Sequence, residues 1–100
     1  MARKITTEAI NAFLAGNKFN KDNTRVSVDG SMSDLFLHDN KIATVAKLST
    51  GGVEIWVTNA GWFTTTTKER LNGIPGVRVN QSKGVWYLNG EEWDGGWKKI

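Results

Sequence analysis

The sequence predicts a single compact α+β domain over residues 1–100, with two helices packed on a single antiparallel sheet of five to seven strands. Three observations lead to this fold class. Apolar residues near the N-terminus recur at helical spacing, the apolar pattern then changes to alternation, and turn residues recur about every ten positions. The predicted order is α-ββββ-α-ββ(β). A chain of this length buries enough surface for a core without disulfides or metals.

The first helix is expected to begin at Thr6 and to end at Gly16. Threonine is a good N-cap, because its hydroxyl accepts a hydrogen bond from a free backbone N–H of the first turn. Glycine is the usual residue just past a helix C-terminus. Three residues at helical spacing are expected to form the buried stripe of this helix: Ile10, Phe13 and Leu14.

Four strands are expected between residues 24 and 57. Apolar and polar residues alternate from Thr24 to Val28, and Asp29-Gly30 is a strong hairpin signal. Ser49-Thr50-Gly51-Gly52 separates the last two strands of this meander. The residues expected to be buried in the strands and in the second helix are Val26, Leu35, Leu37, Ile55, Val57 and Leu71.

The second helix is expected to open with a capping box, Thr66-Thr67-Lys68-Glu69, and to stop at Gly73 before Pro75. Two strands follow at residues 77–80 and 85–88. Asn89-Gly90 is a signal for a type I′ turn, after which residues 91–100 are expected to return as one short strand.

The composition offers little for catalysis. There is no cysteine and His38 is the single histidine, which leaves nothing for a disulfide, a thiolate metal site or a typical zinc site. His38 stands beside an Asp-Asn turn, where a solvated surface role is expected. Glu91, Glu92 and Asp94 follow a tight turn, so solvated charge explains them better than a glycosidase carboxylate pair. We therefore expect no enzyme activity, no catalytic residue, no cofactor and no metal.

Tryptophan is unusually frequent, with five in the chain. Phe36 and Trp56 alternate with the core residues of their strands, so we expect a helix to cover them on the second face of the sheet. Trp86 is expected in the core. Three others lie in glycine-rich irregular segments and are candidates for a binding surface, with core packing as the alternative: Trp62, Trp93 and Trp97.

The segment from Gly61 to Arg70 is the most informative stretch for function. Repeated threonines lead into a helix start, whose free N–H groups and dipole attract anions, although ordinary threonine capping explains the same residues. Basic residues continue beyond it, while the whole chain carries a formal charge of only +3. The candidate binding residues around this segment are Trp62, Thr64, Thr65, Lys68, Arg70, Arg78 and Lys83.

Parts of the chain resemble small tailed-bacteriophage proteins of similar length. The resemblance is most specific over Asn59-Ala60-Gly61-Trp62-Phe63 and the following residues to Gly73, with Pro75-Gly76-Val77 after them. It continues in Trp86-Tyr87-Leu88-Asn89-Gly90, with Trp93 and Trp97, and in Lys4-Ile5-Thr6 and Phe19-Asn20-Lys21. No activity is assigned to that group. The resemblance implies a virus-encoded accessory protein that acts inside a bacterium.

Three functions are compatible with these observations. The first is a non-enzymatic phage accessory protein that binds and modulates, for instance inhibits, a host protein. The second is a small nucleic-acid-binding protein that uses the basic and tryptophan-bearing surface around residues 61–84. The third is a phage structural or assembly component that self-associates. No apolar run has the length of a signal peptide or a membrane span, so we expect the cytoplasm of the bacterial host and no membrane partner.

Overall fold

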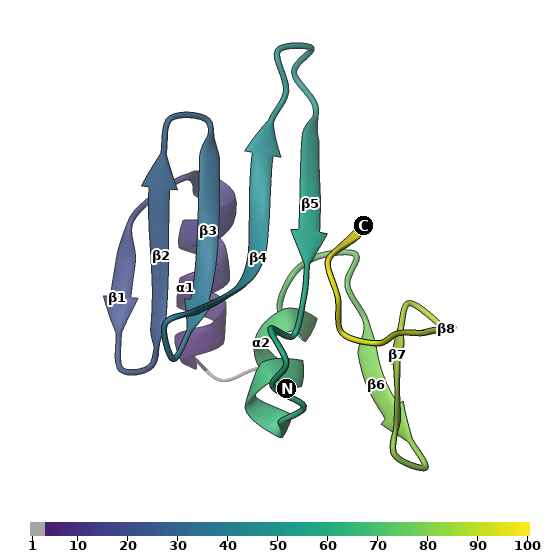
Figure 1. The fold of residues 1–100 in the computed structure, drawn as a ribbon. Coiled ribbons are helices and arrows are strands. Elements are labelled where there is room, and N and C mark those ends of the chain that lie inside the picture. Colours follow the sequence, from purple (N-terminus) through teal and green to yellow (C-terminus); the bar gives the residue numbers. More distant parts are fainter. Residues whose placement is uncertain (1–3) are drawn as a thin grey trace.

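A computed structural model describes residues 4–100, and over this range the chain forms two helices and two antiparallel sheets (Figure 1). The prediction of an α+β fold is confirmed, but the prediction of a single sheet is wrong. The larger sheet has the strand order β1-β2-β3-β4-β5-β9, and the smaller sheet has the order β6-β7-β8. The elements are α1 (Lys4–Ala15), β1 (Phe19–Lys21), β2 (Thr24–Asp29), β3 (Met32–Leu37), β4 (Asn40–Lys47), β5 (Val53–Val57), α2 (Thr65–Asn72), β6 (Val79–Ser82), β7 (Val85–Leu88), β8 (Glu91–Glu92) and β9 (Lys98–Lys99).

Helix α1 already includes Lys4, so Thr6 lies inside the helix and is not its N-cap. Thr6 is fully buried because it faces α2, which the local sequence did not indicate. The predicted end is confirmed. Gly16 has a φ of +75°, and the N–H of Asn17 donates to the carbonyl of Ala12 at 2.9 Å, as in a Schellman motif.

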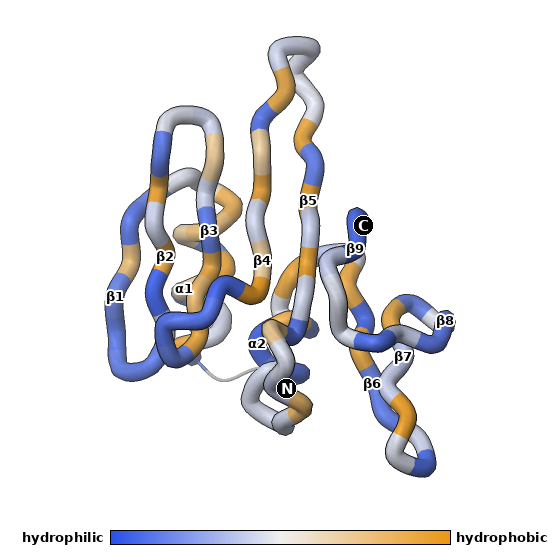
Figure 2. Tube along the Cα trace, in the orientation of Figure 1, coloured by the Kyte–Doolittle hydropathy of each residue, from blue (hydrophilic) through white to orange (hydrophobic). Residues whose placement is uncertain are grey.

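Apolar and polar residues alternate along β2 to β4, as Figure 2 shows, and α1 covers the apolar face of the sheet. Leu14 and Ile55 pack against the core but remain partly exposed. The other residues predicted to be buried are buried: Ile10, Phe13, Val26, Leu35, Leu37, Val57 and Leu71.

Phe36 and Trp56 lie on the opposite face of the larger sheet, and the prediction that a helix covers them is wrong. Strand alternation points both side chains away from α1, and within residues 4–100 no helix lies in front of that face (Figure 1). The Arg25 guanidinium stacks over the Phe36 ring at 4.1 Å from its centroid, and Trp56 is 37% exposed. A polar, solvated sheet face therefore replaces the expected second helix layer.

A β-bulge between β3 and β4 positions one residue of the candidate site. Leu35 pairs with Ala43 but Phe36 pairs with Lys41, so Ile42 is an extra residue on β4. Its side chain is 1% exposed, and its carbonyl accepts a hydrogen bond from the N–H of Thr58 at 2.8 Å. The bulge thus turns a branched apolar side chain inward, toward the segment that follows β5.

The smaller sheet begins two residues later than predicted, at Val79, whose backbone is bonded by the side chain of Asn72 at the end of α2. The Asn72 amide accepts from the Val79 N–H at 2.6 Å and donates to the Val79 carbonyl at 2.9 Å. Asn89 and Gly90 both have positive φ, as the type I′ prediction requires. The single return strand predicted for residues 91–100 is wrong, because β8 joins the smaller sheet while β9 pairs with β5.

Candidate functional site

A tight turn presents Trp62 to solvent. Its two central residues, Ala60 and Gly61, have φ values of +55° and +85°, and the Trp62 N–H donates to the Asn59 carbonyl at 2.8 Å. The side chain of Asn59, which is 1% exposed, accepts a hydrogen bond from the Gly61 N–H at 2.8 Å. The backbone N–H of Asn59 in turn donates to the Gly95 carbonyl at 2.9 Å. Backbone and side-chain bonds therefore fix the turn against the C-terminal segment.

Two adjacent aromatic residues follow this turn, and we call Trp62 and Phe63 the aromatic pair. Their side chains are 52% and 56% exposed. Phe63 also meets the buried ring of Trp86 edge-on, with 5.1 Å between ring centroids. Phe63 was not among the predicted site residues, although its position in an irregular segment beside Trp62 gave the same signal for exposure.

The N-cap of helix α2 lies two residues before the predicted one. Its N-cap is Thr64, whose hydroxyl oxygen accepts from the Thr67 N–H at 3.2 Å and lies 2.9 Å from the Thr67 hydroxyl. Thr66 is therefore inside the first turn, and Glu69 is not a capping residue. Thr65, which was also predicted to bind, is exposed on that turn.

A cavity of about 180 Å³ lies between this helix start and the ends of β3 and β4. We call it the α2 cavity. Leu37, Ile42 and Trp62 give it apolar walls, and its polar lining comes from His38, Thr64, Thr66 and Thr67. The structure thus brings two of the predicted site residues, Trp62 and Thr64, to one hollow. The bulge at Ile42 supplies a wall that sequence reasoning missed.

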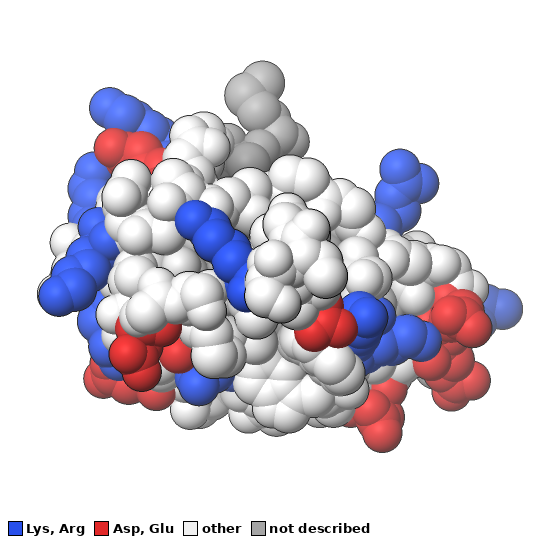
Figure 3. All heavy atoms as spheres, turned by 90° about the horizontal axis from the view of Figure 1, so that it is seen from above, with Lys and Arg blue, Asp and Glu red and all other residues white. Residues whose placement is uncertain are grey.

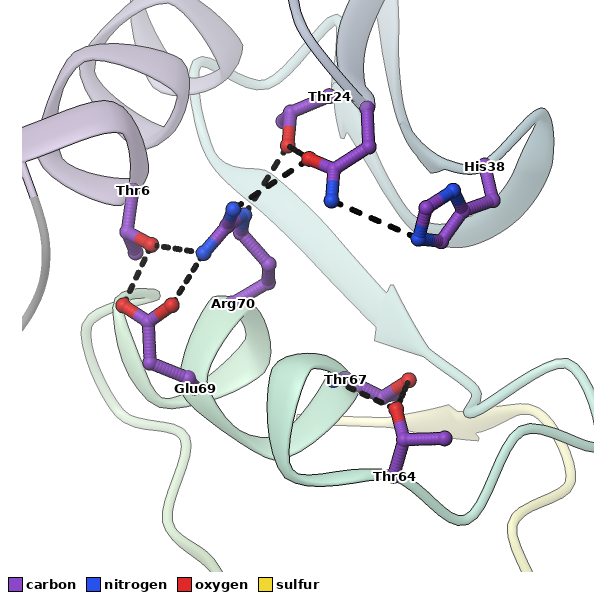
Figure 4. A network of polar contacts seen from close by, with 8 residues as sticks. Thr6, Thr24, His38, Thr64, Thr67, Glu69 and Arg70 are labelled. Carbon is purple, nitrogen blue, oxygen red and sulfur yellow. Dashed lines mark hydrogen bonds and ion pairs between the residues drawn. The ribbon is translucent and has the colours of Figure 1, made fainter.

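Arg70 is not a surface residue, so the prediction that it offers a charge to a ligand is wrong. Its side chain is 1% exposed and points from α2 toward α1 and β2 (Figure 4). The guanidinium donates to the hydroxyls of Thr6 at 2.7 Å and Thr24 at 3.0 Å, and it forms an ion pair with Glu69. Arg70 therefore joins three elements of the core, because each of them turns a polar atom toward the same buried point.

The other predicted basic residues do not gather into one patch. The Lys68 ammonium donates to the Gln81 side chain at 2.9 Å and lies 5.4 Å from the centroid of the Trp86 ring. Arg78 and Lys83 flank the two ends of β6, so at about 3.3 Å per residue they stand about 16 Å apart. Figure 3 shows small groups of basic and acidic side chains, and uncharged surface separates one group from the next.

The remaining candidate tryptophans have different environments. Trp93 is 6% exposed and its indole N–H donates to the Gly96 carbonyl at 2.8 Å, so it belongs to the core and not to a binding surface. Trp97 is 49% exposed and lines an open hollow of about 510 Å³ that also includes Glu92 and Asp94. Of these two residues, only Trp97 is exposed at the surface.

His38 is the one histidine of the chain and lies at the rim of the α2 cavity. Its Nε2 atom is 3.5 Å from the amide nitrogen of Asn23. Among residues 4–100, no group of three or more His, Asp or Glu side chains is arranged to hold a metal ion. In the same range, neither helix has the length and apolar character needed to cross a bilayer.

Comparison with known proteins shows which family the chain resembles. A family model described as Kyanoviridae Gp96 protein matches residues 2–99. No curated protein and no solved structure matches the chain. The match covers nearly the whole chain and confirms the resemblance to small proteins of tailed phages. The chain belongs to the Kyanoviridae Gp96 protein family.

Proposed function

We propose that this phage protein acts by binding, without chemistry of its own, and that it modulates a protein in the cytoplasm of the infected host. The aromatic pair carries the proposal. Trp62 and Phe63 are adjacent and each is more than half exposed, whereas large aromatic side chains are normally placed in the core. Exposed tryptophan and phenylalanine are enriched at the centres of protein interfaces, where a few such residues supply most of the binding energy.

The anchoring of the aromatic pair also favours this function. Hydrogen bonds fix the turn before Trp62, and Phe63 leans on Trp86 in the core. A side chain held in place before binding loses less conformational entropy when the partner arrives, so more of its contact energy appears as affinity.

Nucleic-acid binding has less support. Such a surface needs several basic side chains that reach phosphates together. Arg70 is buried in an ion pair, Lys68 is engaged by Gln81, and Arg78 stands far from Lys83. An enzyme also has less support, because His38 contacts an amide, whereas a catalytic base is normally oriented by a carboxylate against a nucleophile.

The test is capture of a partner from bacterial lysate, with and without nuclease, followed by measurement of the dissociation constant for the purified partner. Trp62→Ala is expected to weaken that affinity by about 30-fold or more, as loss of an aromatic hot spot does. Trp97→Ala is the matched control, because Trp97 has similar exposure and lines a different hollow. The control is expected to bind like the wild type.

Three results would contradict the proposal. Capture that disappears with nuclease would favour nucleic-acid binding. Self-association on size-exclusion chromatography, with no foreign partner, would favour an assembly role. Equal affinities for the wild type and a folded Trp62→Ala, Phe63→Ala double variant would exclude the aromatic pair as the contact surface.

A further inference from the structure

Three of the four polar residues that line the α2 cavity contact another polar side chain of the protein. The hydroxyls of Thr64 and Thr67 lie 2.9 Å apart, and Thr67 is fully buried. The Nε2 atom of His38 faces the amide of Asn23 at 3.5 Å. Leu37 and Ile42 are only 4% and 1% exposed at the base of the hollow, so the apolar surface that a ligand reaches first is that of Trp62, with Thr66 beside it.

The charge of the lining limits what can enter. Among residues 4–100, those that line the α2 cavity include no lysine, arginine, aspartate or glutamate. An ammonium or carboxylate group placed there would lose hydration without gaining an opposite charge, which costs several kcal/mol. Charge complementarity therefore requires an uncharged occupant.

The size of the cavity limits the occupant further. At about 180 Å³ it exceeds only slightly the cavity of about 150 Å³, lined by aliphatic and aromatic side chains, that binds benzene in an engineered protein. One aliphatic or aromatic side chain fits such a space. A nucleotide with its sugar and phosphate is too large, and the described lining offers its phosphate no lysine or arginine.

We propose that the α2 cavity receives one uncharged apolar side chain of the protein partner, inserted beside Trp62. This inference rests on the proposed function, because Trp62 is both a wall of the cavity and half of the exposed aromatic pair. A partner that covers the pair lies over the cavity mouth, so the two form one continuous contact surface. The aromatic pair supplies the contact area, and the cavity selects the partner residue.

A probe experiment tests the cavity without the partner. Benzene is titrated into the protein, and the methyl signals of Leu37 and Ile42 are followed by NMR. We expect a saturable shift of both signals. The shift should disappear in Thr66→Phe, which adds a ring to the lining, and persist in Thr65→Phe, which adds the same ring to an exposed neighbour on the same turn. Circular dichroism confirms that both variants fold, and Thr66→Leu replaces Thr66→Phe if the latter does not.

The same variants test insertion by the partner. Thr66→Phe is expected to weaken partner affinity at least tenfold, and Thr65→Phe to change it less than threefold. If Trp62→Ala weakens binding but Thr66→Phe does not, the proposed function stands and the insertion is refuted. Benzene shifts that rise linearly without saturation, or that are equal in the two variants, also refute the cavity as an apolar site. If no partner is captured at all, both proposals fail together.

Discussion

Arg70→Met is the substitution that most directly tests how this fold is held together. Methionine keeps much of the length and volume of arginine but has no charge and no N–H donors. The change removes the donors that reach Thr6 on α1 and Thr24 on β2, and it removes the ion pair between Arg70 and Glu69. Packing is largely retained, so the loss of stability reports the polar network.

The structure sets the expected size of that loss. Removing one member of a buried ion pair costs about 3–5 kcal/mol, since the other charge remains uncompensated. Arg70 is 1% exposed, but Glu69 is 22% exposed and water can partly solvate it. We therefore expect the lower end, about 3 kcal/mol, which is a large share of the 5–15 kcal/mol of a typical domain.

Urea unfolding measures this loss. With an m-value of about 1.5 kcal/mol/M, the midpoint should fall by about 2 M. Arg78→Met is the matched control, because Arg78 is exposed, and it should change stability by no more than about 0.5 kcal/mol. Glu69→Gln combined with Arg70→Met should cost less than the sum of the two single substitutions, because both remove the same ion pair. A loss below 1 kcal/mol for Arg70→Met, or one equal to the control, would refute the view of Arg70 as a buried connector.

Three further substitutions test other parts of the fold by urea unfolding. Thr64→Ala should cost about 1 kcal/mol because it removes the α2 N-cap, and a larger loss for Thr66→Ala would place the cap elsewhere. Phe13→Ala should cost about 3–5 kcal/mol, and a loss under 1 kcal/mol would mean that α1 does not dock. Gly73→Ala should cost about 1–3 kcal/mol, since its Cβ would lie 2.6 Å from Thr6 Cγ2, and unchanged stability would show that the helices are farther apart.

The sequence predicted those features that depend on a few neighbouring residues. Three such features depend on short stretches of sequence, and the structure confirms each of them. They are the change from helical to alternating hydrophobic spacing, the end of α1 at Gly16 and the turn at Asn89-Gly90. The same windows predicted most of the buried strand residues, since alternation alone assigns a side chain to one face of a sheet. For the candidate site, the local pattern correctly marked Trp62 as a residue in an irregular, exposed segment.

Only the tertiary structure decided features that join distant parts of the chain. From its local sequence, Arg70 is predicted to be a surface charge. Its burial depends on Thr6 and Thr24, which lie far from it in sequence and accept its hydrogen bonds. The return of β9 to the larger sheet is another such feature, because its pairing with β5 spans about forty residues that no local pattern connects. The α2 cavity is another such feature, because its walls come from the bulge on β4, at Ile42, and from the turn after β5, at Trp62. Composition and periodicity determined which residues could be buried, and long-range contact determined which polar groups were buried with them.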